Sequence, residues 1–228
     1  MSEHGRSVSG PGDVLARFVG VPFRRQTYRN LAYLLLAFPL GVGYFTLVTT
    51  GLSSGIGLAA TLVGIPIVVA TLAAAIGIGA FERRLAAWFL DTDIDSVETG
   101  IEFEMDSLEG VVATGKRIVT SPAAWMGLLL VGLKFVFGVV AFTALVTAGS
   151  LAVVLVSMPV YYDAPGIVYT LGPYVVDTLP KAFAGGVLGV VLLLVSLHVL
   201  NGLARFGGFV TDTLSTAGRA KTTGGDDG

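Results

Sequence analysis

The chain has 228 residues, of which 54% are hydrophobic and 13% are charged, and its formal net charge is −2. Soluble domains carry about 25% charged residues, so this composition indicates a membrane protein and argues against a nucleic-acid-binding one. The absence of cysteine excludes disulfides, thiolate metal sites and a cysteine nucleophile, and two histidines are too few for a histidine-rich zinc site.

No apolar run occurs in the first 30 residues, so they do not form a cleavable signal peptide. We expect residues 1–14 to be a disordered tail and residues 15–215 to form a membrane domain. Four apolar segments in that domain can each cross about 30 Å of hydrocarbon, which takes roughly 20 helical residues. The predicted spans are about residues 31–52, 56–81, 125–148 and 181–204. Because these runs are continuously apolar, a β-barrel is not expected.

The positions of lysine and arginine predict the orientation of the spans. Five of the 14 precede the first span, four lie between the second and third, and three follow the fourth. Only Lys181 lies on the other side, and Lys134 is inside a span. Cytoplasmic loops are rich in these residues, so both termini and the acidic loop 91–120 are predicted to be cytoplasmic, in a cell membrane.

The outer connection, residues 149–180, contains four prolines and is therefore not expected to be one continuous helix. Its tyrosines are typical of an interfacial aromatic belt, and the alternative is a small external ligand patch. They are Tyr161, Tyr162, Tyr169 and Tyr174.

The chain also shows an internal similarity. A shift of 97 residues aligns the first span with the third and matches identical residues, among them Phe38 with Phe135, Gly41 with Gly138 and Phe45 with Phe142. We interpret this as two repeated hairpins that both enter from the cytoplasm, related by an axis along the membrane normal. The predicted fold class is thus an all-α integral membrane protein with four transmembrane helices arranged as two repeated hairpins, with interfacial helices on the cytoplasmic side.

Several segments resemble the putative sensor domain family of prokaryotic two-component systems. In the first half they are "FRRQTYRNLAYLLLAFPLG", "TLVGIP" and "ERRLAAWFL". In the second half they are "SPAAWMGLLLVGLKFVFG" and "LPKAFAGGVLGVVLLLVSLHVLNGLARF". The resemblance covers about residues 15–215. It implies a multi-pass membrane sensor of the kind found ahead of histidine kinases.

After Leu214 the sequence is "STAGRAKTTGGDDG", and we expect residues 216–228 to be a disordered tail. The resemblance therefore predicts a stand-alone sensor, without catalytic activity or cofactor, that passes a membrane or extracellular cue to a separate cytoplasmic protein such as a histidine kinase. A homo-oligomer is compatible with this prediction. The alternatives are a membrane scaffold or assembly protein and a small transporter or channel subunit.

Two ionisable residues lie inside predicted spans, and they are Lys134 and His198. A charged group in hydrocarbon is costly and marks a candidate functional site. If the third and fourth spans face each other, the two residues could form an intramembrane pair. The alternative is that Lys134 snorkels to the headgroups or forms a structural pair.

Interfacial anchors are predicted around the spans, because Leu85, Trp88 and Phe89 share one helical face beside two arginines. The predicted anchors are Arg24, Arg25, Arg29, Arg83, Arg84, Trp88 and Trp125.

The stretch "DTDIDSVETGIE" places Asp91, Asp93, Asp95 and Glu102 at the spacing of an EF-hand calcium loop. Ser96 stands where such a loop requires glycine, and no lysine or arginine balances the acids of this segment. We therefore interpret it as a hydrated acidic connector, with calcium binding as the alternative. No Walker A loop is present.

Overall fold

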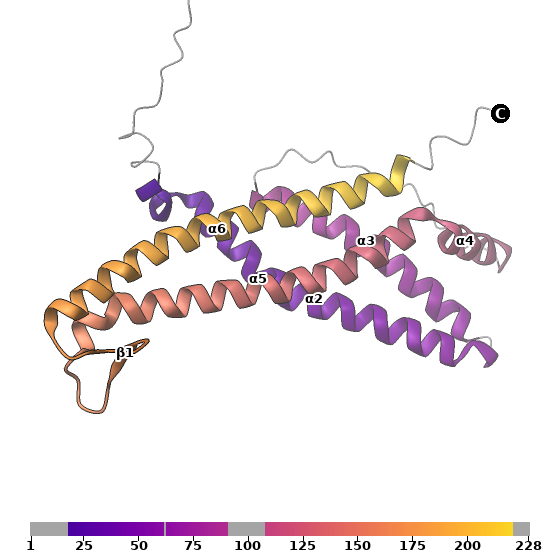
Figure 1. The fold of residues 1–228 in the computed structure, drawn as a ribbon. Helices are drawn as coiled ribbons and strands as arrows, with labels where there is room; N and C mark the ends of the chain where they lie inside the picture. Colours follow the sequence, from indigo (N-terminus) through magenta and orange to yellow (C-terminus); the bar gives the residue numbers. More distant parts are fainter. Residues whose placement is uncertain (1–17, 62, 91–107, 221–228) are drawn as a thin grey trace, which may run out of the picture. The chain divides into compact units, whose positions relative to one another are not determined.

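A computed structural model describes residues 18–61, 63–90 and 108–220. These residues form two compact units. The first unit contains residues up to Tyr28 together with Ala144–Gly202, and the second contains Arg29–Thr143 together with the residues from Leu203 onward. Five α-helices and two short strands occur in the described residues (Figure 1).

The helices are α2 (Arg25–Gly57), α3 (Gly64–Leu90), α4 (Leu108–Thr120), α5 (Pro122–Tyr161) and α6 (Leu179–Ala220). Four of them, all but α4, are long and apolar enough to cross a membrane. Only 17% to 33% of their most apolar windows is buried inside the protein. Such large exposed apolar surfaces require lipid rather than water around them. The chain is therefore a helical membrane protein with four predicted spans, as its composition indicates.

In the second unit, α2 and α3 form an antiparallel hairpin. Gly51, near the end of α2, lies against Thr71 in the first half of α3. Tyr33, near the start of α2, has its ring 6.3 Å from the ring of Phe89, near the end of α3. A 3₁₀ turn (Ala59–Thr61) connects the two helices, and the Thr61 hydroxyl donates a hydrogen bond to the Leu58 carbonyl at 2.7 Å.

The helices α2 and α5 cross closely and run in opposite directions. A Cβ atom added at Gly41 would lie 2.8 Å from the carbonyl oxygen of Lys134, and one at Gly138 would meet the backbone of Ala37. Two stacked ring pairs flank the crossing, Phe38 with Phe142 at 4.6 Å and Phe45 with Phe135 at 4.5 Å between centroids. The 97-residue offset that aligns the two segments in sequence also relates these contacts to each other. It converts the contact of Gly41 with Lys134 into that of Gly138 with Ala37. It likewise converts the Phe38–Phe142 ring pair into the Phe45–Phe135 pair. The internal repeat itself stays a prediction.

The helices α3 and α5 run in the same direction. Gly127, near the start of α5, lies against the backbone of Ala75, and Lys134, two turns later, contacts Glu82. The end of α3 and the start of α5 are therefore at opposite ends of the second unit. In the same unit, Gly207 of α6 lies against the ring of Phe137, and Gly208 lies against the side chain of Leu90.

This arrangement differs from the predicted direction of the second hairpin. Lysine and arginine counts place residues 83–117 on the cytoplasmic side of the membrane, and they predict that both hairpins enter the membrane from that side. In the second unit, Arg84 and Lys116 lie near opposite ends, because glycine and ring contacts hold α5 antiparallel to α2. The connecting residues 91–107 lie outside the described residues.

The helix boundaries also differ from the predicted ones. Helices α2, α5 and α6 extend past the predicted spans at both ends, and α5 continues to Tyr161 through residues that we expected to be loop. The second span was predicted to begin at residue 56, but α2 continues to Gly57 and α3 runs from Gly64 to Leu90. The predicted acidic loop 91–120 ends in helix α4. The predicted tail 216–228 begins within α6, which extends to Ala220. Residues 1–14 lie outside the described residues.

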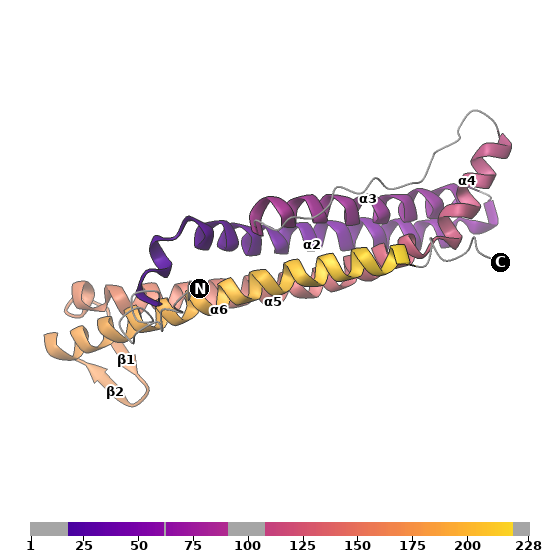
Figure 2. The same cartoon turned by 90° about the horizontal axis from the view of Figure 1, so that it is seen from above.

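The first unit contains the turn between α5 and α6. Strands β1 (Tyr169–Leu171) and β2 (Tyr174–Val176) form an antiparallel hairpin there, visible in Figure 2. Its two-residue loop begins with Gly172 at φ 61°, and Pro173 follows, which is compatible with a type II′ turn. The hairpin packs through Val176 on Leu155, Met158 and Ala182. Glycines of α6 face α5 again, since Gly189 lies against Leu155.

Candidate functional site

A buried polar cluster joins three helices of the second unit. The Nζ atom of Lys134 on α5 lies 2.5 Å from Oε2 of Glu82 on α3. It also donates a hydrogen bond to the Tyr33 hydroxyl on α2, at 2.8 Å, and lies 4.6 Å from the centroid of that ring. Lys134 is 3% exposed, and Glu82 and Tyr33 are 0% exposed. The ion pair is thus removed from solvent within helices that are otherwise apolar.

Small residues allow these three helices to come close enough for the contacts. Gly41 and Gly138 bring the backbones of α2 and α5 together next to Lys134. Between α3 and α5, Gly127 faces the backbone of Ala75, and a Cβ atom added at Gly79 would lie 3.7 Å from the side chain of Leu130. Close approach through glycine is typical of membrane helices. The cluster therefore depends on the packing of the whole second unit.

The energetics of the pair are asymmetric. Two opposite charges that are buried together recover through their attraction part of the cost of leaving water. A single buried charge without its partner is destabilising by about 3–5 kcal/mol. Lys134 also gains from the electron-rich face of Tyr33, since cations are attracted to aromatic rings. The cluster is thus neutral overall, but each charge depends on the other.

The cluster is incompletely satisfied. The Tyr44 hydroxyl and both carboxylate oxygens of Glu82 are buried and have no hydrogen bond of good geometry among the described residues, although Oε2 forms the ion pair. The carboxylate is close enough to act electrostatically on Tyr44. Unpaired buried acceptors are rare in proteins. Tyr44 is therefore a second polar neighbour of the Glu82 carboxylate, besides Lys134.

His198 belongs to the first unit and has other neighbours. Its Nδ1 atom lies 2.8 Å from the carbonyl oxygen of Leu194, and its ring stacks on Phe18 with a centroid distance of 4.3 Å. Asn201, one turn further along α6, donates a hydrogen bond to the Thr27 hydroxyl at 3.3 Å. These contacts hold Phe18, which precedes α2, and the first turn of α2 against α6 inside the first unit. The intramembrane pair of Lys134 with His198 stays a prediction, and the structure gives Lys134 Glu82 as its ionic partner.

Residues 7–214 match the family described as putative sensor. The chain belongs to the putative sensor family. This confirms the family that the sequence motifs indicate, over nearly the whole chain. No curated protein and no solved structure matches the chain.

Glu82 is the site residue that sequence reasoning missed in this member of the putative sensor family. The predicted second span ended at Phe81, so Glu82 was counted with the arginines outside the membrane. A helix-period pattern could have revealed it. The buried positions of α3 include Leu72, Ala75, Gly79, Glu82, Ala86 and Phe89, spaced three or four residues apart. Glu82 therefore continues the buried stripe of α3 and does not begin an exposed segment.

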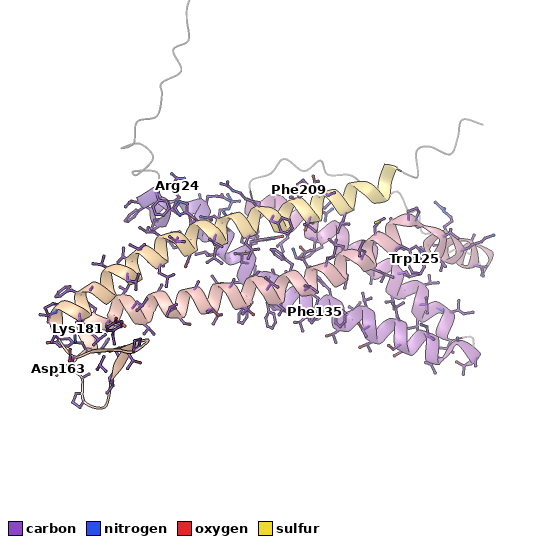
Figure 3. The ribbon with its side chains drawn as sticks, viewed as in Figure 1. Arg24, Trp125, Phe135, Asp163, Lys181 and Phe209 are labelled. Carbon is purple, nitrogen blue, oxygen red and sulfur yellow. The ribbon has the colours of Figure 1, made fainter. Side chains whose placement is uncertain are left out.

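The predicted anchors do not form one group. In the second unit, Arg29 donates a hydrogen bond to the Trp88 carbonyl near the end of α3, where Arg83 and the exposed Arg84 also lie. Trp125 lies at the start of α5, where its indole nitrogen donates a hydrogen bond to the Val119 carbonyl at 3.1 Å. Arg24 and Arg25, which are exposed, belong to the first unit. Figure 3 labels Arg24 and Trp125.

The acidic candidates for a metal site, Asp91, Asp93, Asp95 and Glu102, lie outside the described residues. Within the part of the chain that the structure describes, no group of three or more histidine, aspartate or glutamate residues could hold a metal ion. Calcium binding by the acidic stretch stays an open alternative.

Proposed function

We propose that this protein is a membrane-embedded signalling subunit, in which a cue shifts the packing of α2, α3 and α5 and a separate cytoplasmic protein reads the change. The observation that carries the proposal is the Glu82–Lys134 ion pair, buried where these three helices meet. Membership of the putative sensor family supports a sensing role. The identity of the reader, a histidine kinase or another signalling protein, belongs to the proposal.

The pair suits a device with two states. Packed cores change between discrete arrangements rather than deforming continuously. The buried Glu82 carboxylate has two polar neighbours, the Lys134 ammonium and the Tyr44 hydroxyl. A shift of α2 relative to α3 would exchange these partners while keeping Glu82 buried. In the proposal the chain itself catalyses no reaction.

The proposed location is the cell membrane, with the arginines that surround the start of α2 on the cytoplasmic side. The excess of arginine there supports this orientation. The placement of both termini on that side remains a prediction from lysine and arginine counts.

The proposal is tested by quantitative affinity capture of the full chain from native membranes, comparing wild type with Lys134→Met. Leu133→Met is the matched control, since Leu133 is the neighbouring residue on α5 and is 41% exposed. We expect a histidine kinase or a response regulator to be captured with the wild type and the control. The captured amount should change with Lys134→Met at equal abundance of the chain.

Two other outcomes would contradict the proposal. Recovery of a structural complex alone, unchanged by Lys134→Met, would favour a scaffold. A charged pair inside apolar helices is also found in transporters. Flux of an ion through reconstituted vesicles that Lys134→Met abolishes and Leu133→Met preserves would favour a transport subunit.

A further inference from the structure

Helix α4 presents a second surface that the buried cluster does not use. One stripe of α4 is buried, with Thr114 and Ile118 one turn apart, and it packs against α3. Ile118 belongs to a core cluster with Leu72 and Ile76 of α3, and a Cβ atom added at Gly115 would lie 3.5 Å from the side chain of Val69. Helix α4 therefore packs along the first half of α3, which is one of the helices long enough to cross the membrane. Val69 lies five residues from the start of α3, about 8 Å along the axis.

The opposite stripe of α4 is exposed. It contains Val112, Lys116 and Val119, at positions i, i+4 and i+7, which share one helical face. Val112 is 71% exposed and Val119 is 39% exposed, and the side chains of Lys116 and Arg117 are exposed as well. Lys116 thus lies between two apolar groups on the side that faces away from the protein, and Arg117 is exposed on the adjoining flank of the helix.

Trp125 extends this exposed surface. Its side chain is 58% exposed, and the indole nitrogen is held by the Val119 carbonyl. The turn between α4 and α5 is short and hydrogen-bonded, since the amide of Ala123 donates to the Ser121 hydroxyl at 3.2 Å. The tryptophan is therefore held at the end of α4, next to Val119.

We propose that the surface formed by Val112, Lys116, Arg117, Val119 and Trp125 binds the headgroup and upper acyl region of an anionic phospholipid. Lysine and arginine supply charge complementarity to the phosphate, and their methylene stems lie along apolar surface. Valine and tryptophan at the end of an apolar helix match the boundary between headgroups and acyl chains. The inference goes beyond the proposed signalling function and does not depend on it.

The two tryptophans of the chain allow a direct test. In a Trp88→Phe protein, Trp125 is the single tryptophan, and its fluorescence is quenched by bromine on lipids that contact it. The full chain is reconstituted in phosphatidylcholine vesicles that contain the same fraction of either brominated phosphatidylglycerol or brominated phosphatidylcholine. We expect stronger quenching by the anionic lipid. With Lys116→Gln/Arg117→Gln added, the ratio of the two quenching efficiencies should fall to about one.

Two control variants accompany the test. Arg24→Gln/Arg25→Gln removes the same charge from exposed residues elsewhere and should keep the preference. Lys116→Arg/Arg117→Lys keeps both charges and should also keep it, which shows that the surface still folds. The proposal is overturned if both lipids quench Trp125 equally in the parent protein, if the glutamine pair keeps the preference, or if the Arg24/Arg25 pair also abolishes it. Absence of quenching by either lipid would also overturn it, because water or another protein would then cover this surface.

Discussion

The ammonium of Lys134 lies 2.5 Å from the carboxylate of Glu82, and both side chains are buried between apolar helices. The two residues are 52 positions apart in sequence and lie on helices that run in the same direction. Their contact therefore reports the packing of the second unit rather than any local preference. It also makes the two charges interdependent, which leads to the first prediction.

Replacing one member of the pair should be more harmful than replacing both. Lys134→Met leaves the buried Glu82 carboxylate without its cation, and Glu82→Gln leaves the buried Lys134 ammonium without its anion. For Lys134→Met we expect a loss of about 3–5 kcal/mol in the free energy of unfolding. The double variant should recover a large part of this loss. The measurement is equilibrium unfolding of all three variants in the same detergent, with Leu133→Met as the control. Additive losses would show that the two residues do not interact.

The crossing of α2 and α5 should be sensitive to a single methyl group. In Gly41→Ala the new Cβ would lie 2.8 Å from the Lys134 carbonyl oxygen, closer than normal contacts allow, so the backbones must separate and the ion pair be disturbed. We expect a loss of about 1–3 kcal/mol, which is typical of overpacking. The matched control is Gly43→Ala on the same helix, since nothing lies within 4 Å of a Cβ there. Equal thermal unfolding temperatures for the two variants would contradict the close crossing.

The turn between α5 and α6 supplies a prediction about pH. The ammonium of Lys181 donates a hydrogen bond to Asp177 at 2.6 Å, and this bond lowers the pKa of the Asp177 carboxyl below its ordinary value. Because the pKa is lower in the folded turn than in the unfolded chain, the ionised carboxylate stabilises the turn at pH values above the unfolded-state pKa. This contribution is lost as the pH falls through the folded-state pKa. Both side chains are exposed, so the effect should be small. Lys181→Met should raise the pKa of Asp177, as measured by carboxyl NMR titration in micelles. An unchanged titration would exclude the ion pair.

Part of this architecture follows from composition and periodicity, and part does not. Apolar runs predicted the four membrane helices, because the length of hydrocarbon sets the length of a span. The same criterion ended the second span at Phe81 and so removed Glu82, the partner of Lys134. Hydropathy averages over a window and cannot distinguish a buried acidic residue from a solvated one at the end of a helix. The 3–4 spacing of the buried positions of α3 carries that distinction.

Packing direction was beyond the reach of residue counts. Lysine and arginine statistics concern sides of a membrane and contain no information about which helices touch. The contacts that reverse α5 relative to the prediction are made by Gly41, Gly138 and four phenylalanines, all of which any membrane helix can contain. Helix α4 was missed for a different reason, since it follows directly on an acidic segment whose charge dominated the interpretation of residues 91–120.

The direction of α5 can be decided by labelling, because the natural chain contains no cysteine. Arg84→Cys and Lys116→Cys each introduce one thiol at an exposed position. In the second unit these positions lie near opposite ends of α3, so we expect a membrane-impermeant maleimide to reach them from opposite sides of sealed vesicles. Labelling of both from the same side would support the sidedness that the cation counts predict. It would also mean that α5 runs antiparallel to α3 in the membrane and that the Glu82–Lys134 contact is not formed there.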